Sequence, residues 1–176
     1  MSVGQDPGGA LLRRAELALT RRVHGLREGD HLSLLIEVNG PGGMYTEIAR
    51  TIVLGRASNE LKDGFEAVRQ AQDHTLSLMK PGAAPRDIHA AHDAYMKQRG
   101  MPPELRLYAH GQGYDLVERP CIRDDEPMKL KANMNITVHP TIGSSRIWVS
   151  MWDNWLITET GVSERLHKTA QDIFPV

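Results

Sequence analysis

The chain has 176 residues, a length that suits a single domain with a core of its own. Apolar residues make up 40% and charged residues 24%, and the formal net charge of −1 indicates neither nucleic acid nor a membrane surface as a partner. The single cysteine, Cys121, excludes an internal disulfide framework and favours the cytoplasm as the location. The N-terminal residues show no secretory signal pattern, and no apolar run is long enough to span a bilayer.

The first part of the chain predicts one helix followed by a hairpin of two strands. Residues 1–9 are rich in glycine and are expected to be irregular, whereas residues 10–23 carry one apolar stripe at helical spacing. After a turn over 27–30, residues 31–38 alternate between apolar and polar side chains, which predicts a strand. A glycine-rich loop then leads to a second predicted strand over 44–55.

Two helices are predicted next. Ser58 is a suitable N-cap for a long helix that ends near the KPG sequence at 80–82. Pro85 stands where a first-turn proline belongs and opens a helix over about 86–99. Gly100 and the two prolines behind it end that second helix.

The last third of the chain predicts a series of short strands, with a turn and a short coda over 161–168. The expected strands cover about 105–109, 112–118, 133–139, 146–152 and 154–159. A helix, a hairpin, two helices and then several antiparallel strands form an α+β pattern.

Acidic and histidine side chains lie on the polar faces of the predicted strands. Glu37 is on the polar face of the first strand, and His139 ends the strand over 133–139. Glu47 lies three residues before Arg50, and His110 precedes a glycine-rich strand entry. Carboxylates and imidazoles that converge from separate strands can hold a divalent metal. The same residues also fit ordinary solvated strand faces.

Six motifs occur in a characteristic order: GDHLSLLIEVNG, YTEIARTIVLG, a helix that ends in KPG, AHGQGYDLVERP, NMNITVHPTI and DNWLITETGVSERL. This series, over about residues 26–168, resembles the creatinase, aminopeptidase P and methionine aminopeptidase superfamily, the M24 peptidases. The resemblance implies the pita-bread fold, which is an α+β fold with a curved antiparallel sheet flanked by helices. Its N-terminal part is expected to be incomplete here.

The peptidases of this superfamily bind two divalent metals through two aspartates, one histidine and two glutamates. The matching positions in this chain are filled, in order, by Glu37, Glu47, His110, His139 and Trp152. Asp153 follows Trp152 and is a further candidate ligand, whereas a second histidine of the family motif is replaced by Val117. The resemblance therefore implies a degenerate metal site, in which one of the five ligand positions, His110, keeps the residue of the family.

These exchanges change what the centre can bind. A bridging carboxylate spans two cations about 3.5–4 Å apart, which the imidazole of His139 cannot do in the same way. The indole of Trp152 donates a hydrogen and ligates nothing. The two-metal site is therefore expected to be lost. One divalent ion (zinc, manganese, iron or cobalt) and a metal-free centre both stay open, with ligands among Glu37, Glu47, His110, His139 and Asp153.

Creatinase-type members of the superfamily cleave a C–N bond without metal, using a histidine as acid and base. His110 with Glu118 is the candidate catalytic pair. The resemblance implies a hydrolase of the Xaa-Pro peptidase or creatinase type that acts on a C–N bond of a small peptide or amide. Trp152 at a ligand position favours the alternative, an inactive pseudoenzyme that serves as a binding or scaffold protein. A lyase is a third alternative, since a fold alone fixes no reaction.

The domain organisation expected from the sequence is a remnant N-terminal segment over 1–25 and a creatinase/aminopeptidase-like catalytic domain over 26–176. The superfamily domain usually has more chain before the GD turn. Either the chain is a fragment of a longer protein, or a partner subunit completes the sheet. Uncovered strand edges make association favourable, so a homodimer is expected.

Overall fold

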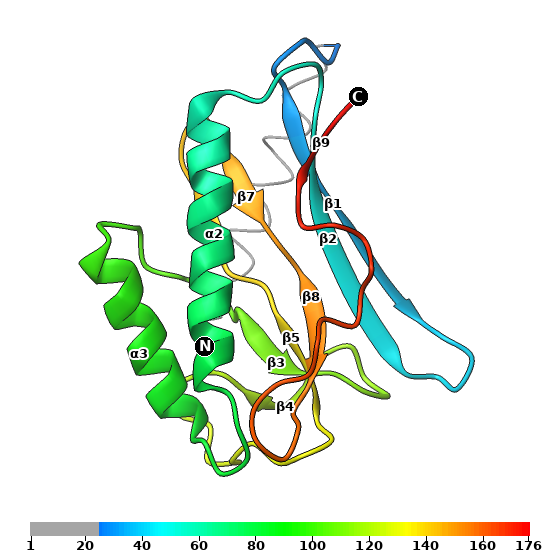
Figure 1. Cartoon of the computed structure of the whole chain (residues 1–176), viewed down its shortest axis with the longest axis vertical. Coiled ribbons are helices and arrows are strands. Elements are labelled where there is room, and N and C mark those ends of the chain that lie inside the picture. Colours follow the sequence, from blue (N-terminus) through cyan, green and yellow to red (C-terminus); the bar gives the residue numbers. More distant parts are fainter. Residues whose placement is uncertain (1–24) are drawn as a thin grey trace, which may run out of the picture.

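The computed structural model describes residues 25–176 (Figure 1). The helix predicted over 10–23 and nearly all of the proposed N-terminal remnant lie outside the described residues. In Figure 1 a long hairpin occupies one side of the molecule and two helices occupy the other, with a second sheet between them. The turn predicted over 27–30 is present just before the hairpin.

The hairpin consists of β1 (His31–Asn39) and β2 (Tyr45–Val53), which pair antiparallel along their whole length. Gly43 in its loop has a φ of 79°, a conformation that favours glycine. The register places Glu37 opposite Glu47, so the two carboxyl groups share one face. A third strand, β9 (Ile173–Pro175), pairs parallel with β2 and leaves β1 at the edge of this sheet; the sequence did not predict it.

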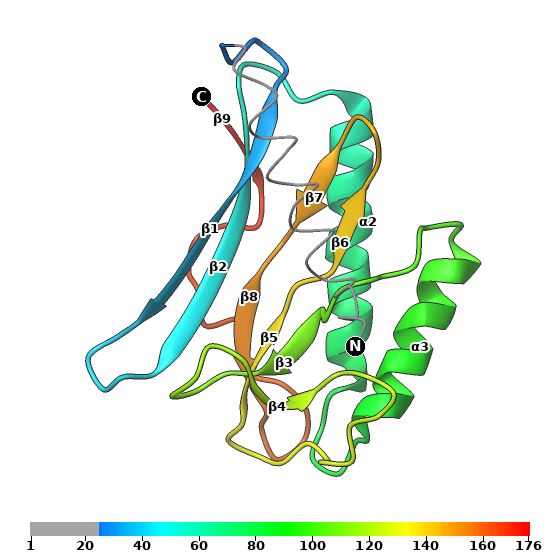
Figure 2. The same ribbon diagram turned by 180° about the vertical axis from the view of Figure 1, so that it is seen from behind.

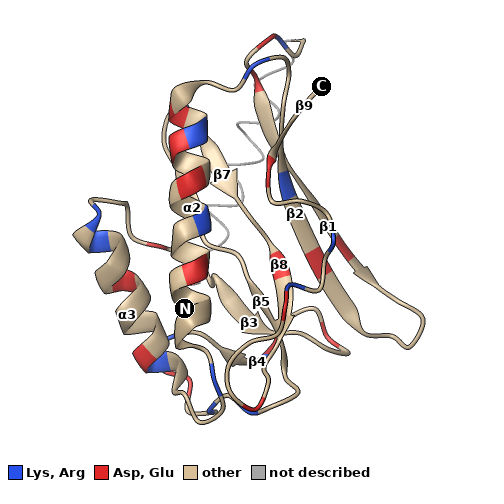
Figure 3. Cartoon of the chain, viewed as in Figure 1, with Lys and Arg blue, Asp and Glu red and all other residues tan. Residues whose placement is uncertain are grey.

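Both predicted helices are confirmed. α2 (Asn59–Leu78) begins after Ser58, whose side chain accepts a hydrogen bond from the Leu61 N–H, and α3 (Pro85–Gln98) begins at its proline. Acidic and basic residues alternate along α2 (Figure 3), and Arg69 forms ion pairs with Glu66 and Asp73 on this helix. Among the described residues, neither helix has an apolar stretch long enough to cross a bilayer.

The second sheet has four antiparallel strands in the order β4-β3-β5-β8. Their bounds are Glu118–Cys121 for β4, Ala109–Gly111 for β3, Asn135–Val138 for β5 and Asp153–Leu156 for β8. A separate two-stranded hairpin joins β6 (Thr141–Gly143) to β7 (Trp148–Ser150). Seen from behind, β6 and β7 lie in front of α2, and β5 and β8 lie between α2 and the β1/β2 hairpin (Figure 2). The α+β prediction is confirmed, as are the strands predicted in the last 45 residues, with shorter bounds.

The strands predicted over 105–109 and 112–118 are wrong in their placement. The chain is irregular up to Tyr108, and residues 113–117 form a bend. The Glu118 carboxylate accepts a hydrogen bond from the Asp115 N–H and thereby closes this bend. A local side-chain hydrogen bond has therefore replaced the ladder that alternation predicted.

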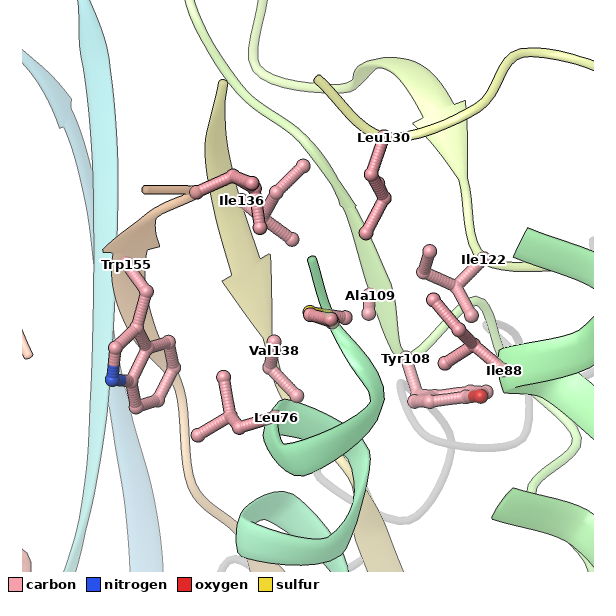
Figure 4. Packing of buried hydrophobic residues seen from close by; sticks show 11 residues of the cluster. Leu76, Ile88, Tyr108, Ala109, Ile122, Leu130, Ile136, Val138 and Trp155 are labelled. Carbon is pink, nitrogen blue, oxygen red and sulfur yellow. The ribbon is translucent and has the colours of Figure 1, made fainter. Parts of the chain in front are cut away.

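The main core lies between the two helices and the four-stranded sheet (Figure 4). Its buried members are Leu76, Met79, Ile88, Tyr108, Ala109, Ile122, Leu130, Ile136, Val138, Trp155 and Ile157. A second cluster packs the first half of α2 against β7 and β2. Fixing β3, β5 and β8 on α2 sets the position of the polar side chains on the opposite face of these strands.

The two sheets meet where β2 passes β8. Ala49 donates its N–H to the carbonyl of Trp152, which forms an isolated antiparallel bridge. Beside it, the guanidinium of Arg50 lies 2.7 Å from the Asp153 carboxylate in a buried ion pair. This junction brings β2 close to His110 in β3 and to His139, which directly follows β5.

Candidate metal centre

Three buried polar side chains meet at the junction of the sheets. Glu47 is the third residue of β2, His110 lies in the middle of β3, and His139 directly follows β5. Because β3 and β5 are hydrogen-bonded neighbours, both imidazoles lie on adjacent strands. The side chains are only 1%, 2% and 3% exposed, so none of them can rely on bulk water for a partner.

The triad of Glu47, His110 and His139 is arranged around one carboxylate oxygen. Oε1 of Glu47 lies 3.8 Å from Nε2 of His110 and 3.7 Å from Nε2 of His139. One ligand atom from each residue lies within 4.8 Å of the other two. Oε1 of Glu47 and Nε2 of His139 have no hydrogen-bond partner among the described residues, although both are buried. Such atoms cost about 1–3 kcal/mol each when unpaired, so the cluster is arranged to receive a further group.

Burial sets the charge states of the triad. Burial raises the pKa of Glu47 from 4.5 to about 7, and the neighbouring negative charge of Glu37 raises it further. Burial also lowers the pKa of His110 and places that of His139 well below its ordinary value. Both imidazoles are therefore neutral at neutral pH, the form in which they ligate a metal.

Glu47 is held in one orientation by two amide side chains. The Gln112 amide donates to Oε2 of Glu47 over 3.1 Å and accepts from the Asn154 amide over 2.8 Å. Asn154 in turn accepts a hydrogen bond from the Glu47 backbone N–H. Oε2 is thereby fixed, and Oε1 is left facing the histidines.

Each histidine is also oriented by a neighbour. Nδ1 of His110 lies 2.8 Å from the carbonyl of Gly111; because a carbonyl only accepts, Nδ1 carries the proton and Nε2 presents its lone pair to Glu47. The ring of His139 stacks on the indole of Trp152, with centroids 4.0 Å apart and planes at 16°. The indole N–H donates to the hydroxyl of Ser150, which fixes the indole in turn.

The three ligand atoms are of the kind and spacing that can hold a divalent cation. Ligand atoms of a four-coordinate zinc with bonds of about 2.1 Å lie roughly 3.4 Å apart, close to the separations of 3.7 and 3.8 Å found here. The orphaned oxygen and nitrogen face one another across this space. Trp152 brings an apolar ring to the triad, stacked on His139, and offers no ligand atom. The Glu–His–His donor set therefore fits a divalent cation.

Two other predicted ligands lie outside the triad. Glu37 is exposed on β1, opposite Glu47, and acts on it as a neighbouring negative charge. Asp153 is fully buried, but its two oxygens accept hydrogen bonds from Arg50, and one of them also accepts from Gln171. Asp153 thus serves the junction of the sheets, with its lone pairs already engaged.

The predicted catalytic pair is not joined by a hydrogen bond. The Glu118 carboxylate accepts from the Asp115 N–H and lies against Gly113, at the bend before β4. His110 directs Nδ1 to Gly111 and Nε2 to Glu47. His110 therefore belongs to the triad, and Glu118 stabilises the bend.

Three residues at this site were not singled out from the sequence. Gln112 and Asn154 orient Glu47, and Arg106 lies over the Trp152 ring with its guanidinium carbon 5.6 Å from the ring centre. Gln112 stands inside the HGQG motif, so its position next to His110 was the one available signal. Nothing in the local sequence marks the other two.

Two largely antiparallel sheets flanked by helices, with a buried Glu–His–His cluster at their junction, form the architecture of the pita-bread fold. The chain belongs to metallopeptidase family M24, whose sequence profile matches residues 11–162.

Individual relatives agree with this assignment. The Xaa-Pro dipeptidase of Pyrococcus furiosus is 30% identical over 138 residues, which are 75% of this chain and 39% of the relative. Methionine aminopeptidase B of Synechocystis is 24% identical over 137 residues, which are 75% of this chain and 50% of the relative. The chain thus spans half or less of the length of both.

Solved structures confirm the predicted fold. The prolidase from Pyrococcus furiosus superposes with a TM-score of 0.74 at 28% identity, covering 82% of this chain and 43% of that one. The X-Pro aminopeptidase from Thermotoga maritima gives a TM-score of 0.77 at 22% identity, covering 86% and 42%. The chain thus spans less than half the length of both solved structures.

Proposed function

We propose that the chain is a hydrolase of the M24 type that acts on a C–N bond of a small peptide or amide, with one divalent metal at the triad. The observation that carries this proposal is the pair of buried, unpartnered ligand atoms, Oε1 of Glu47 and Nε2 of His139, which face His110 and one another. The substrate class is supported by the similarity to Xaa-Pro dipeptidases. Two imidazoles and a carboxylate suit zinc, iron, manganese or cobalt.

The residues of the chain have distinct roles in this proposal. Glu47, His110 and His139 would hold the ion, and burial keeps both imidazoles neutral so that their lone pairs are available. Gln112 and Asn154 prevent the Glu47 carboxylate from turning away. A bound cation of this kind polarises a carbonyl oxygen and lowers the pKa of a water molecule. The Trp152 ring closes one side of His139 and shields that side from water.

The test is metal-dependent hydrolysis by the purified full chain. Chelator-treated protein is supplied in turn with zinc, manganese, cobalt or ferrous ions and assayed on Xaa-Pro dipeptides and small amides. Turnover should appear with at least one ion and disappear in the His139→Ala variant. His89→Ala, at a half-buried position of α3 outside the triad, is the matched control and should behave as the wild type. Turnover that is equal in chelated wild type and in His139→Ala would contradict the proposal.

A binding or scaffold function without catalysis is the second candidate. Its supporting observation is Trp152, which presents an apolar ring directly against His139. Under this alternative a peptide binds in isothermal titration, but no cation supports turnover. His110→Ala would then leave peptide affinity unchanged.

A further inference from the structure

His167 lies at one end of a hydrogen-bond chain whose other end is the Glu47 carboxylate. Nε2 of His167 is 3.1 Å from Oδ1 of Asn154. The Asn154 amide donates to Oε1 of Gln112 over 2.8 Å, and the Gln112 amide donates to Oε2 of Glu47 over 3.1 Å. Two amide side chains therefore connect His167, which follows β8 in the sequence, to a ligand of the triad.

The chemistry of donors and acceptors fixes the direction of each of these bonds. The Glu47 backbone N–H donates to Oδ1 of Asn154 over 3.0 Å, so this atom is the amide oxygen and only accepts. Nε2 of His167 must therefore carry the proton that it donates to Asn154. If the Asn154 amide turned over, its NH2 group would face the N–H groups of Glu47 and His167. The N–H of His167 thus favours the one amide orientation in which Asn154 donates to Gln112, and Gln112 to Glu47.

The segment after β8 holds His167 in this place. The Leu166 N–H donates to the Asn154 carbonyl over 2.9 Å, and Nε of Arg165 donates to the His167 carbonyl over 3.0 Å. The segment therefore turns back on the strand that carries Asn154. His167 is half-buried and lines an open cavity of about 490 Å³ together with Trp155. Because its side chain borders this cavity, a replacement of similar size at position 167 leaves no hole in the packed core.

We propose that His167 is a positioning residue of the metal centre, which acts through Asn154 and Gln112 on the orientation of Glu47 and does not touch the ion. This role deepens the proposed function and rests on it. Removing a hydrogen-bond partner behind a metal ligand typically weakens metal binding by about 10- to 100-fold. The effect of His167 belongs at the lower end, about 10-fold, because the Glu47 N–H still holds Asn154 in its absence.

Three variants separate the hydrogen bond of His167 from its packing. His167→Phe keeps an aromatic ring and removes the N–H that Asn154 accepts. His167→Gln ends in an amide N–H that can take the place of Nε2, so it keeps the donor. Lys168→Ala is the matched control, because Lys168 is the next residue, is exposed and lines the same cavity.

The test is cobalt(II) titration of the chelator-treated full chain, which gives the Kd and the visible absorption band of each variant. His167→Phe should raise the Kd about 10-fold and shift the band, because Glu47 is held less firmly in one orientation. His167→Gln and Lys168→Ala should keep the Kd and the band of the wild type. Urea unfolding of the same variants measures stability separately. A residue with a merely structural role would change stability and leave the Kd and the band as they are.

A wild-type Kd in His167→Phe, or a loss of affinity that His167→Gln shares, overturns the role of His167. A wild type that binds no cobalt contradicts the metal centre instead, and hydrogen exchange of the metal-free chain, followed by NMR, then decides about His167. The Glu47 N–H donates to Asn154, so it should exchange several-fold faster in His167→Phe and at the wild-type rate in His167→Gln. Equal rates in the wild type and in His167→Phe would overturn the orienting role.

Discussion

Replacing Glu47 by glutamine removes the charge of the triad and keeps nearly the same shape. In the metal-free protein the carboxyl group is buried, and burial raises its pKa from 4.5 to about 7. The unfolded chain therefore loses this proton at lower pH than the folded chain does. Stability from this group is fully present below pH 4.5 and is lost as the pH rises through about 7.

The magnitude follows from the two pKa values. A shift from 4.5 to about 7, at about 1.4 kcal/mol per pH unit, lowers the free energy of unfolding by about 3 kcal/mol between pH 4.5 and 8. Glutamine at this position does not titrate. Glu47→Gln should therefore match the wild type near pH 4.5 and exceed it by about 3 kcal/mol at pH 8 in the presence of a chelator.

Urea unfolding of both proteins at several pH values between 4.5 and 8, with chelator throughout, measures this difference. The lowered pKa values of His110 and His139 destabilise both proteins as the pH falls below 6.5, so their effect cancels in the comparison to first order. A difference that stays flat over this pH range would refute the reasoning, because it would mean that Glu47 ionises in the folded chain as easily as in the unfolded one.

Three further predictions concern the scaffold. Asp153→Asn should lower the free energy of unfolding in urea by roughly 3–5 kcal/mol, because it leaves the charge of Arg50 buried without its partner. Glu66→Gln, which breaks an exposed ion pair, should lower it by less than about 1 kcal/mol. Equal losses in the two variants would rule out a special role for the junction of the sheets. Ser58→Ala should lower the free energy of unfolding by about 1 kcal/mol, because it removes the acceptor for the Leu61 N–H. Ser58→Asp should change it very little, because aspartate can accept the same hydrogen bond. A loss of similar size in both variants would argue against a capping role. We also expect a homodimer that associates through β1, since this edge strand exposes Leu34 and Ile36. Ile36→Glu should then sediment as a monomer in analytical ultracentrifugation. A wild type that sediments as a monomer would contradict this expectation.

The hairpin and both helices could be predicted because their signals are local. β1 alternates over nine residues, and Ser58 and Pro85 mark the starts of the helices. The placement of β3 and β4 could not be predicted, since these short strands depend on pairing with β5 and on the bend that Glu118 closes. β9 is three residues long and exists only through β2, far away in the sequence.

The candidate site was predictable to a different degree at each position. The order of motifs pointed to Glu47, His110 and His139, which the structure brings together. The sequence could not show that Asp153 is already engaged by Arg50, because that contact joins strands about a hundred residues apart. The orienting role of Gln112 depends on the same long-range geometry, which no local pattern encodes.

The central claim is that Glu47, His110 and His139 form a site for one divalent cation. Titration of the chelator-treated full chain with cobalt(II), followed by its visible absorption and by equilibrium dialysis, tests this directly. One cobalt ion per chain, with an absorption band that His139→Ala abolishes and His89→Ala preserves, is the predicted result. Two ions per chain, or binding that is unchanged in His139→Ala, would contradict the claim.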